Sequence, residues 1–243
     1  MHLASLFIAV LALPAAAQWT RLSLPASGVE PDSDCNTGDM SADGRFVAFD
    51  TYSAVFDAAD TNGKSDVYVL DRNSGAFVRA SLANAGAQID GESFVAQISD
   101  DARFVAFTSD GLNLAAGMVQ GNYQVFRRDL TLGTSALVSV GTGGALANGS
   151  YSTCAAVSAD GRLVFFHSDA SNLVAGPSNG FVGTYMRDMQ TGVTSRVVIG
   201  LGGALPDSDV WLTSITPDGR YLALHSTATN LVLGDGNDDY DVF

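Results

Sequence analysis

Asp43-Gly-Arg-Phe-Val-Ala-Phe49 is the stretch that decides the fold of this chain, because versions of it occur four times. It returns as DARFVAF from Asp101, as DGRLVFF from Asp160 and as DGRYLAL from Asp218. The arginines of these stretches are 58, 59 and 58 residues apart, at Arg45, Arg103, Arg162 and Arg220. A period this regular indicates one supersecondary unit copied four times.

Each unit shows the pattern of four short strands. A first strand precedes the repeated stretch, the Asp-Gly pair makes a tight turn, and a second strand follows at Phe46–Phe49 in the first unit. A loop of about fifteen residues leads to a third strand such as Val67–Leu70, and a turn from Asp to Gly leads to a fourth. Four antiparallel strands, repeated without a helix between them, are typical of a propeller blade. We therefore predict an all-β fold, a β-propeller of four-stranded antiparallel blades.

The repeat also sets the boundaries of the units. Residues 19–24 are in phase with the fourth strands, and a leading strand of this kind completes the last blade of many propellers. The fourth unit stops inside a third strand at Phe243. We expect an incomplete ring, a fragment of a propeller of about six to eight blades. The predicted parts are a leading outer strand and loop at 18–34, blade 1 at 35–83, blade 2 at 84–141, blade 3 at 142–200 and a partial blade 4 at 201–243.

The composition favours a folded, acidic protein rich in turns. Of 243 residues, 47% are hydrophobic and 16% charged, which is enough apolar material for a core. The 26 acidic residues include only two Glu, and Lys64 is the single lysine, whereas Asp prefers turns to helices. A net charge of −14 opposes binding to nucleic acid or to an anionic membrane.

The N-terminus resembles a secretory signal peptide. An apolar run from Leu3 to Leu13 is followed by Ala15-Ala16-Ala17, so residues 1–17 are expected to be removed during export to the periplasm or the medium. The run is too short to span a bilayer, and no membrane span is expected after its removal. Cys35 and Cys154 lie in blades that are not neighbours, so we expect two free thiols.

Three motifs resemble the TolB-like, WD-repeat-like propellers of exported bacterial proteins: Ser41–Phe49, Asp66–Val69 and Ala228–Asn237. The similarity extends from Trp19 to Phe243. It implies the propeller fold, but such blades serve as envelope scaffolds and also as domains of peptidases and lyases, so it implies no single function.

The long loop of the first and fourth units carries the pattern of a calcium site. Alternating carboxylate and amide oxygens around a glycine suit Ca²⁺, the one cofactor that we predict. The pattern resembles the calcium loops in the propellers of integrin α subunits, although Ala58 and Leu233 replace the first Asp. The alternative is that these side chains only shape their loops through local hydrogen bonds. The predicted ligands are Asp60, Asn62, Asp66, Asp235, Asn237 and Asp241.

Two further sets recur at equivalent positions. One lies in the loop before each first strand, and we expect it on the same face as the long loops: Asp32/Asp34, Asp90/Glu92, Asn148/Ser150 and Asp207/Asp209. The other follows each second strand and could line the mouth of the channel: Asp50, Thr108, His167 and His225. A metal or acid–base site is one interpretation of the second set, and ordinary hydrogen bonding is the other.

We find no nucleophile elbow, zinc-protease motif or P-loop, and we predict no enzymatic activity for this chain. The sequence favours an exported binding or scaffold module whose acidic loop face takes a protein or carbohydrate ligand. The alternative is a propeller that positions the substrate of a larger secreted hydrolase or lyase, whose catalytic part lies elsewhere or in the channel mouth.

Overall fold

The computed structural model describes residues 20–141 and 143–243, and the predicted signal peptide and Trp19 lie outside this range. The chain forms four antiparallel sheets, one for each unit of the repeat, and strand order in every sheet follows the sequence. Sheets 1 to 3 have four strands and sheet 4 has three. The predicted all-β fold with propeller-like blades is therefore confirmed.

The strands begin and end close to the repeat boundaries. Sheet 1 contains β1 (Cys35–Met40), β2 (Phe46–Thr51), β3 (Asp66–Asp71) and β4 (Ala76–Arg79). Sheet 2 contains β5 (Ser93–Ile98), β6 (Phe104–Ser109), β7 (Gln124–Asp129) and β8 (Thr134–Leu137). Sheet 3 contains β9 (Ser152–Val157), β10 (Leu163–Ser168), β11 (Gly183–Asp188) and β12 (Val193–Arg196). Sheet 4 contains β13 (Val210–Ile215), β14 (Leu222–Ser226) and β15 (Asp241–Val242).

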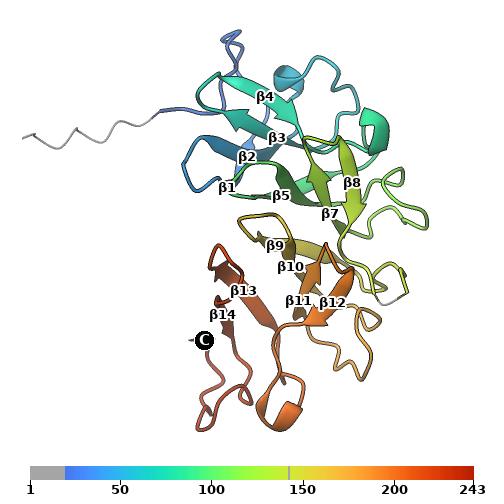
Figure 1. Ribbon diagram of the computed structural model, residues 1–243, viewed down its shortest axis with the longest axis vertical. Helices are drawn as coiled ribbons and strands as arrows, with labels where there is room; N and C mark the ends of the chain where they lie inside the picture. The colour runs from blue at the N-terminus through green and yellow to red at the C-terminus, as the bar shows by residue number, and fades with distance from the viewer. Residues whose placement is uncertain (1–19, 142) are drawn as a thin grey trace, which may run out of the picture.

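The sheets follow one another in an open arc from the top to the bottom of Figure 1. The first strands are neighbours, since β5 contacts β1 and β9, and β9 contacts β13. The core lies between the sheets, where Val69 of sheet 1 packs in one cluster with Val105 and Phe107 of sheet 2. A second cluster joins Val125 of sheet 2 to Phe166 of sheet 3. Burial between successive sheets thus holds the arc together.

Short 3₁₀ turns lie in the loops, at η1 (Ala54–Phe56), η2 (Asn84–Gly86) and η3 (Leu201–Gly203). No helix in the described ranges is long and apolar enough to cross a membrane.

The repeated stretch forms the turn between first and second strands. In the first unit the Ser41 hydroxyl donates to Asp43 Oδ1 (2.7 Å), which also accepts the Arg45 backbone N–H (2.9 Å). The next residue, Gly44, has a φ of +68°, a backbone conformation that glycine adopts without a steric penalty. The same Ser or Thr pairs with the same Asp in the other units. The four turns are therefore copies of one structure.

Three of the four repeated arginines join the second strand to the third. Arg45, Arg103 and Arg162 form ion pairs with Asp71, Asp129 and Asp188, at 2.8, 2.7 and 2.6 Å. The Arg162 guanidinium holds the pKa of Asp188 well below its usual range. These charge-assisted hydrogen bonds tie the start of the second strand to the end of the third in these three sheets. Arg220 lies over the Tyr221 ring (5.1 Å) and forms no ion pair in the described part of the chain.

The leading strand expected at residues 19–24 does not form in the part that the structure describes. Residues 20–34 contain no strand, and Leu22 packs instead against the aromatic cluster of sheet 1. The strand was expected to complete the last blade of a closed ring; sheet 4, the last sheet described, lies at the other end of the arc (Figure 1). Cys35 and Cys154 are both free, as predicted.

Gly161 and Gly44 occupy the same turn position and provide a matched test of packing between sheets. Both have φ near +69°, but a Cβ on Gly161 would overlap the Phe104 ring, whereas the nearest atoms to a Cβ on Gly44 are 3.6 Å away. We expect G44A to lower the free energy of unfolding by about 1–2 kcal/mol, the cost of the left-handed backbone. G161A should cost about 1–3 kcal/mol more, because the ring must shift. Urea unfolding measures both, and equal losses would contradict the packing argument.

Candidate ligand-binding loop face

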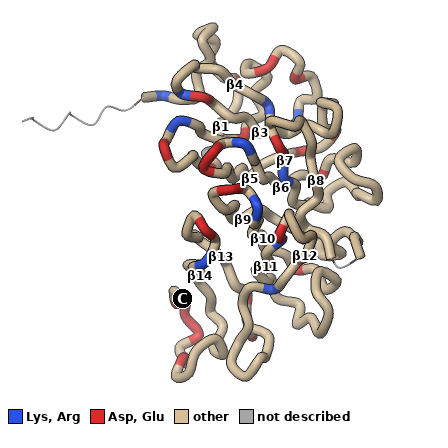
Figure 2. The backbone as a smooth tube through the Cα atoms, viewed as in Figure 1, with Lys and Arg blue, Asp and Glu red and all other residues tan. Residues whose placement is uncertain are grey.

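One edge of every sheet carries the long loops, and we call it the loop face. It is formed by the starts of the first and third strands and the ends of the second and fourth, because neighbouring strands are antiparallel. Figure 2 shows acidic segments in every unit and fewer basic ones. Both predicted acidic sets lie in loops of this face.

The acidic set before each first strand braces the loops. Asp90 Oδ1 accepts backbone N–H bonds from Leu112 (2.6 Å) and Asn113 (3.2 Å) of the neighbouring long loop. The equivalent Asn148 and Asp207 accept N–H bonds in the same way, at 2.9 and 2.8 Å. These side chains accept hydrogen bonds from the backbone of the long loops. Their role in this structure is therefore to hold the loops in shape.

In the first unit, the predicted calcium ligands surround an arginine. The Arg79 side chain is 5% exposed, and its guanidinium lies 3.5 Å from Asp60, 3.5 Å from Asp66 and 3.0 Å from Asp57. Tyr68 Oη donates to Asp60 (2.7 Å), and the Ser81 hydroxyl donates to Asp66. Burial raises the pKa of Asp66 to about 6. A cation entering this loop would have to displace Arg79.

Asn62, the third predicted ligand of this loop, forms hydrogen bonds with backbone groups. Its Nδ2 donates to the Ile89 carbonyl (2.9 Å), and its Oδ1 accepts the Lys64 N–H (2.9 Å). The sequence pattern therefore located a real polar cluster, but the structure brings a cation from β4 into it.

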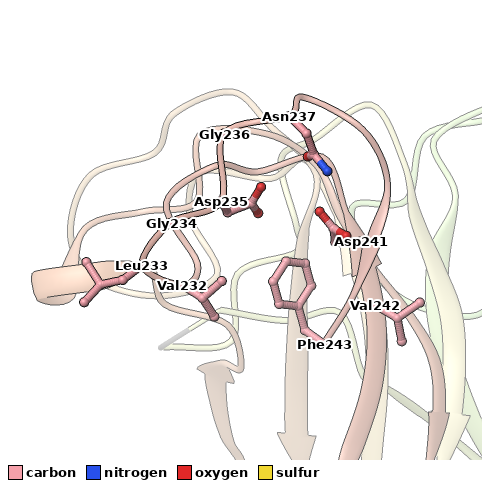
Figure 3. A pocket seen from close by; sticks show the side chains of 9 residues that line it. All are labelled: Val232, Leu233, Gly234, Asp235, Gly236, Asn237, Asp241, Val242 and Phe243. Atoms are coloured by element: carbon pink, nitrogen blue, oxygen red, sulfur yellow. The ribbon is translucent and has the colours of Figure 1, made fainter.

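In the fourth unit, the side chains of Asp235, Asn237 and Asp241 point into one hollow of about 740 Å³ (Figure 3). Asp235 and Asp241 are half-buried, and Asn237 Oδ1 accepts the Asp239 N–H (3.2 Å). Within residues 20–141 and 143–243, no three His, Cys, Asp or Glu side chains gather as a metal site. Amide and backbone oxygens would have to complete a Ca²⁺ shell here, and calcium binding stays a prediction.

The recurring set predicted to follow each second strand lies instead inside it, at the penultimate residue of β2, β6, β10 and β14, and it joins neighbouring sheets. Asp50 Oδ1 accepts the Val95 N–H (3.3 Å), Thr108 Oγ1 accepts the Cys154 N–H (2.9 Å) and His167 Nε2 accepts the Leu212 N–H (2.8 Å). Each donor lies at a β-bulge in the first strand of the next sheet. The fourth member, His225, contacts the Tyr240 ring, with centroids 5.3 Å apart. The set therefore has a structural role that the repeat alone did not reveal.

A second hollow, of about 440 Å³, opens on the loop face between sheets 1 and 2, and we call it the interblade pocket. The sequence analysis identified only one of its residues, Asp50. Tyr52, another of its residues, stands where the repeat is broken, because it takes the place of Asp110 and Asp169 in the next two units. The lining residues used below are Asn36, Asp50, Tyr52, Ser65, Phe94 and Val95.

Solved structures similar to this chain are β-propellers, as the repeat motifs predicted. TolB from Acinetobacter baumannii has 21% identity and a TM-score of 0.42, over 80% of this chain and 40% of that one. The β-propeller domain of the Trilobed protease from Pyrococcus furiosus has 12% identity and a TM-score of 0.42, over 88% of this chain and 58% of that one. Oligogalacturonate lyase from Vibrio parahaemolyticus has 14% identity and a TM-score of 0.42, over 82% and 48%.

The chain thus spans about half the length of these proteins or less, and the likeness concerns the fold. No protein-family model matches the chain. No curated protein matches it either.

The bond at His167 makes stability depend on pH. Burial lowers the pKa of His167 from 6.5 to about 4, so the unfolded chain takes up its proton first as the pH falls. The contribution of His167 is therefore fully present above pH 6.5 and is lost between pH 6.5 and about 4. The loss is on the order of 3 kcal/mol at most.

We expect H167Q to remove this fall and H225Q to keep it, because H225Q leaves the His167 bond intact. The measurement is urea unfolding between pH 4 and 7. For each variant, the free energy of unfolding is compared with that of the parent protein at the same pH. The contributions of other titrating groups, such as Asp66, cancel in this difference. A parallel pH dependence in H167Q and the parent would refute the assignment.

Proposed function

We propose that this chain is an exported, non-catalytic β-propeller module that binds a protein partner with a basic surface on its loop face. The observation that carries the proposal is the distribution of charge. The cations of the loop face are engaged: Lys64 pairs with Glu92 (3.3 Å), Arg79 pairs with its three carboxylates, and Arg196 lies over the Tyr185 ring (4.9 Å). Across the described range, several carboxylates of this face have no cationic partner: Asp34, Asp50, Asp235, Asp238, Asp239 and Asp241.

The opposite face is different, because it carries three Arg–Asp ion pairs, such as Arg103 with Asp129, and further arginines such as Arg72 and Arg220 beside its acids. An acidic surface attracts basic partners over about a Debye length, roughly 8–10 Å at moderate salt. The signal peptide supports export, so we place the partner in the periplasm or the medium.

The alternative function, a propeller that positions substrate for a larger hydrolase or lyase, stays a prediction. The similar structures include TolB and enzyme propellers alike, so they favour neither function. A carbohydrate ligand is an outcome that the experiments below distinguish.

Neutralising exposed acids of the loop face should weaken binding of a polycation. We expect poly-L-lysine to bind the parent protein with an affinity that falls as salt is raised. The variant D34N/D238N/D239N should bind about tenfold more weakly, since each exposed charge contributes about 0.5 kcal/mol. D100N, which removes an exposed carboxylate from the opposite face, should bind like the parent. Equal affinities for the triple variant and D100N would refute a basic partner on this face.

We propose that Ca²⁺ binds in the long loop of the fourth unit rather than the first. Asp235 and Asp241 face an open hollow, whereas Asp60 and Asp66 already face Arg79. A ligand at 100 times its Kd stabilises the folded state by about 2.7 kcal/mol. Millimolar CaCl₂ should therefore raise the Tm of the parent relative to EDTA, and D235N/D241N should lose the shift. N62A, which changes the first loop instead, should keep the shift. A shift that depends on Asn62 and not on Asp235 would reverse the assignment.

A further inference from the structure

The interblade pocket contains a buried carboxylate that no cation neutralises. Asp50 is 6% exposed, and its oxygens accept bonds from two neutral donors, Asn36 Nδ2 (3.0 Å) and the Val95 N–H (3.3 Å). Burial raises the pKa of Asp50 above its ordinary value. A buried charge without a counter-charge is unfavourable, so this carboxylate calls for an explanation beyond the fold.

The fold itself does not require that negative charge. At the next two junctions the same bulge N–H is held by neutral acceptors, the Thr108 hydroxyl and the ring of His167. The lowered pKa of His167, about 4, keeps its ring neutral at physiological pH. A neutral side chain therefore suffices to join the sheets, and only the first unit places a carboxylate there.

A second polar group in the pocket lacks any partner. Ser65 is 2% exposed, and its hydroxyl oxygen is buried without a hydrogen bond to the protein. Its backbone is fully engaged, because its N–H donates to Glu92 (2.8 Å) and its carbonyl accepts the Ser93 N–H (2.8 Å). Buried polar atoms are rarely left unpaired, so the hydroxyl is available to a ligand in the pocket that it lines.

The remaining wall is aromatic and strained. In the next two units, the residues equivalent to Tyr52 hold the loop: Asp110 accepts the Glu92 N–H (2.7 Å) and Asp169 accepts the Ser150 N–H (3.0 Å). Tyr52 itself is 54% exposed. The Phe94 ring packs on Tyr123, with centroids 4.9 Å apart. Val95 has a φ of +54°, which is unfavourable for a β-branched residue. Strained residues of this kind concentrate at functional sites.

These features point to an organic cation. We propose that the interblade pocket binds a guanidinium or ammonium group, with Asp50 as counter-charge, the Ser65 hydroxyl as hydrogen-bond acceptor and the faces of Tyr52 and Phe94 as cation–π partners. A metal ion fits poorly, because Ca²⁺ needs six to eight oxygen ligands, whereas the pocket offers one carboxylate and the few neutral oxygens of side chains such as Asn36, Ser65 and Gln97. This inference rests on the proposed function, since it supplies the anchor for a basic side chain of the partner.

The experiment uses short peptides as probes, with isothermal titration calorimetry on the whole chain at low ionic strength. Acetyl-Gly-Arg-Gly-amide is compared with its citrulline counterpart, which has the same shape and no charge. Agmatine serves as a free guanidinium, and methyl glucoside as a neutral sugar. We expect the arginine peptide to bind at least tenfold more tightly than the citrulline peptide. Equal binding of the two peptides, or preferential binding of the glucoside, would overturn the proposal.

The deciding variant is D50T, which installs the acceptor that the second unit already uses. It should keep the Tm of the parent and weaken binding of the arginine peptide at least tenfold. Y52A and S65A, which leave the interblade bond intact, should each weaken it at least threefold, and they decide the matter if D50T does not fold. Unchanged affinity in these variants refutes the pocket. A stronger affinity for agmatine than for the peptide assigns the site to free amines rather than to a basic partner.

The two proposals fail separately. Suppose that the arginine peptide does not bind, but that poly-L-lysine binds the parent more tightly than it binds D34N/D238N/D239N. The proposal for the loop face is then supported and the proposal for the interblade pocket is refuted. If neither probe binds, both proposals fall.

Discussion

The arc of sheets depends on a hydrogen bond that recurs at each junction between neighbours. Every first strand contains a β-bulge, and at three junctions the N–H at the bulge is directed toward the preceding sheet. A buried N–H must be paired, so the penultimate residue of the second strand has to offer an acceptor. This bond complements the apolar packing between sheets, because packing alone is not directional.

The position must therefore supply a hydrogen-bond acceptor, but several residue types can do so. Aspartate, threonine and histidine all meet it, and they differ in charge and in response to pH. The long loops show a similar freedom. In the first unit, Asp60 and Asp66 enclose Arg79, whereas in the second unit Leu137 stands at the position of Arg79 and Gln124 at that of Asp66. One backbone therefore hosts a buried ionic network in one blade and a neutral set in the next.

The sequence predicted the parts of the structure that repeat. Four copies of one turn and the strands on either side of it follow from local spacing. The arginine among the predicted calcium ligands did not, because Arg79 lies thirteen or more residues from those carboxylates and reaches them only after β3 and β4 pair. The interblade pocket was also missed. It joins residues of two units. The sequence does show Tyr52 in place of an aspartate, but this difference has a meaning only once the structure shows that the equivalent aspartates hold the loops.

Open sheets can associate with other chains along their unpaired edge strands, and the outer strands of this chain are short. β4, β8 and β12 have four residues each, whereas the first three strands of the same sheets have six. A short edge offers few backbone groups to another chain, and natural proteins limit aggregation in this way. Val78 and Val193 are nevertheless about half exposed on these strands. The brevity of each outer strand thus limits the length of edge along which another chain could pair.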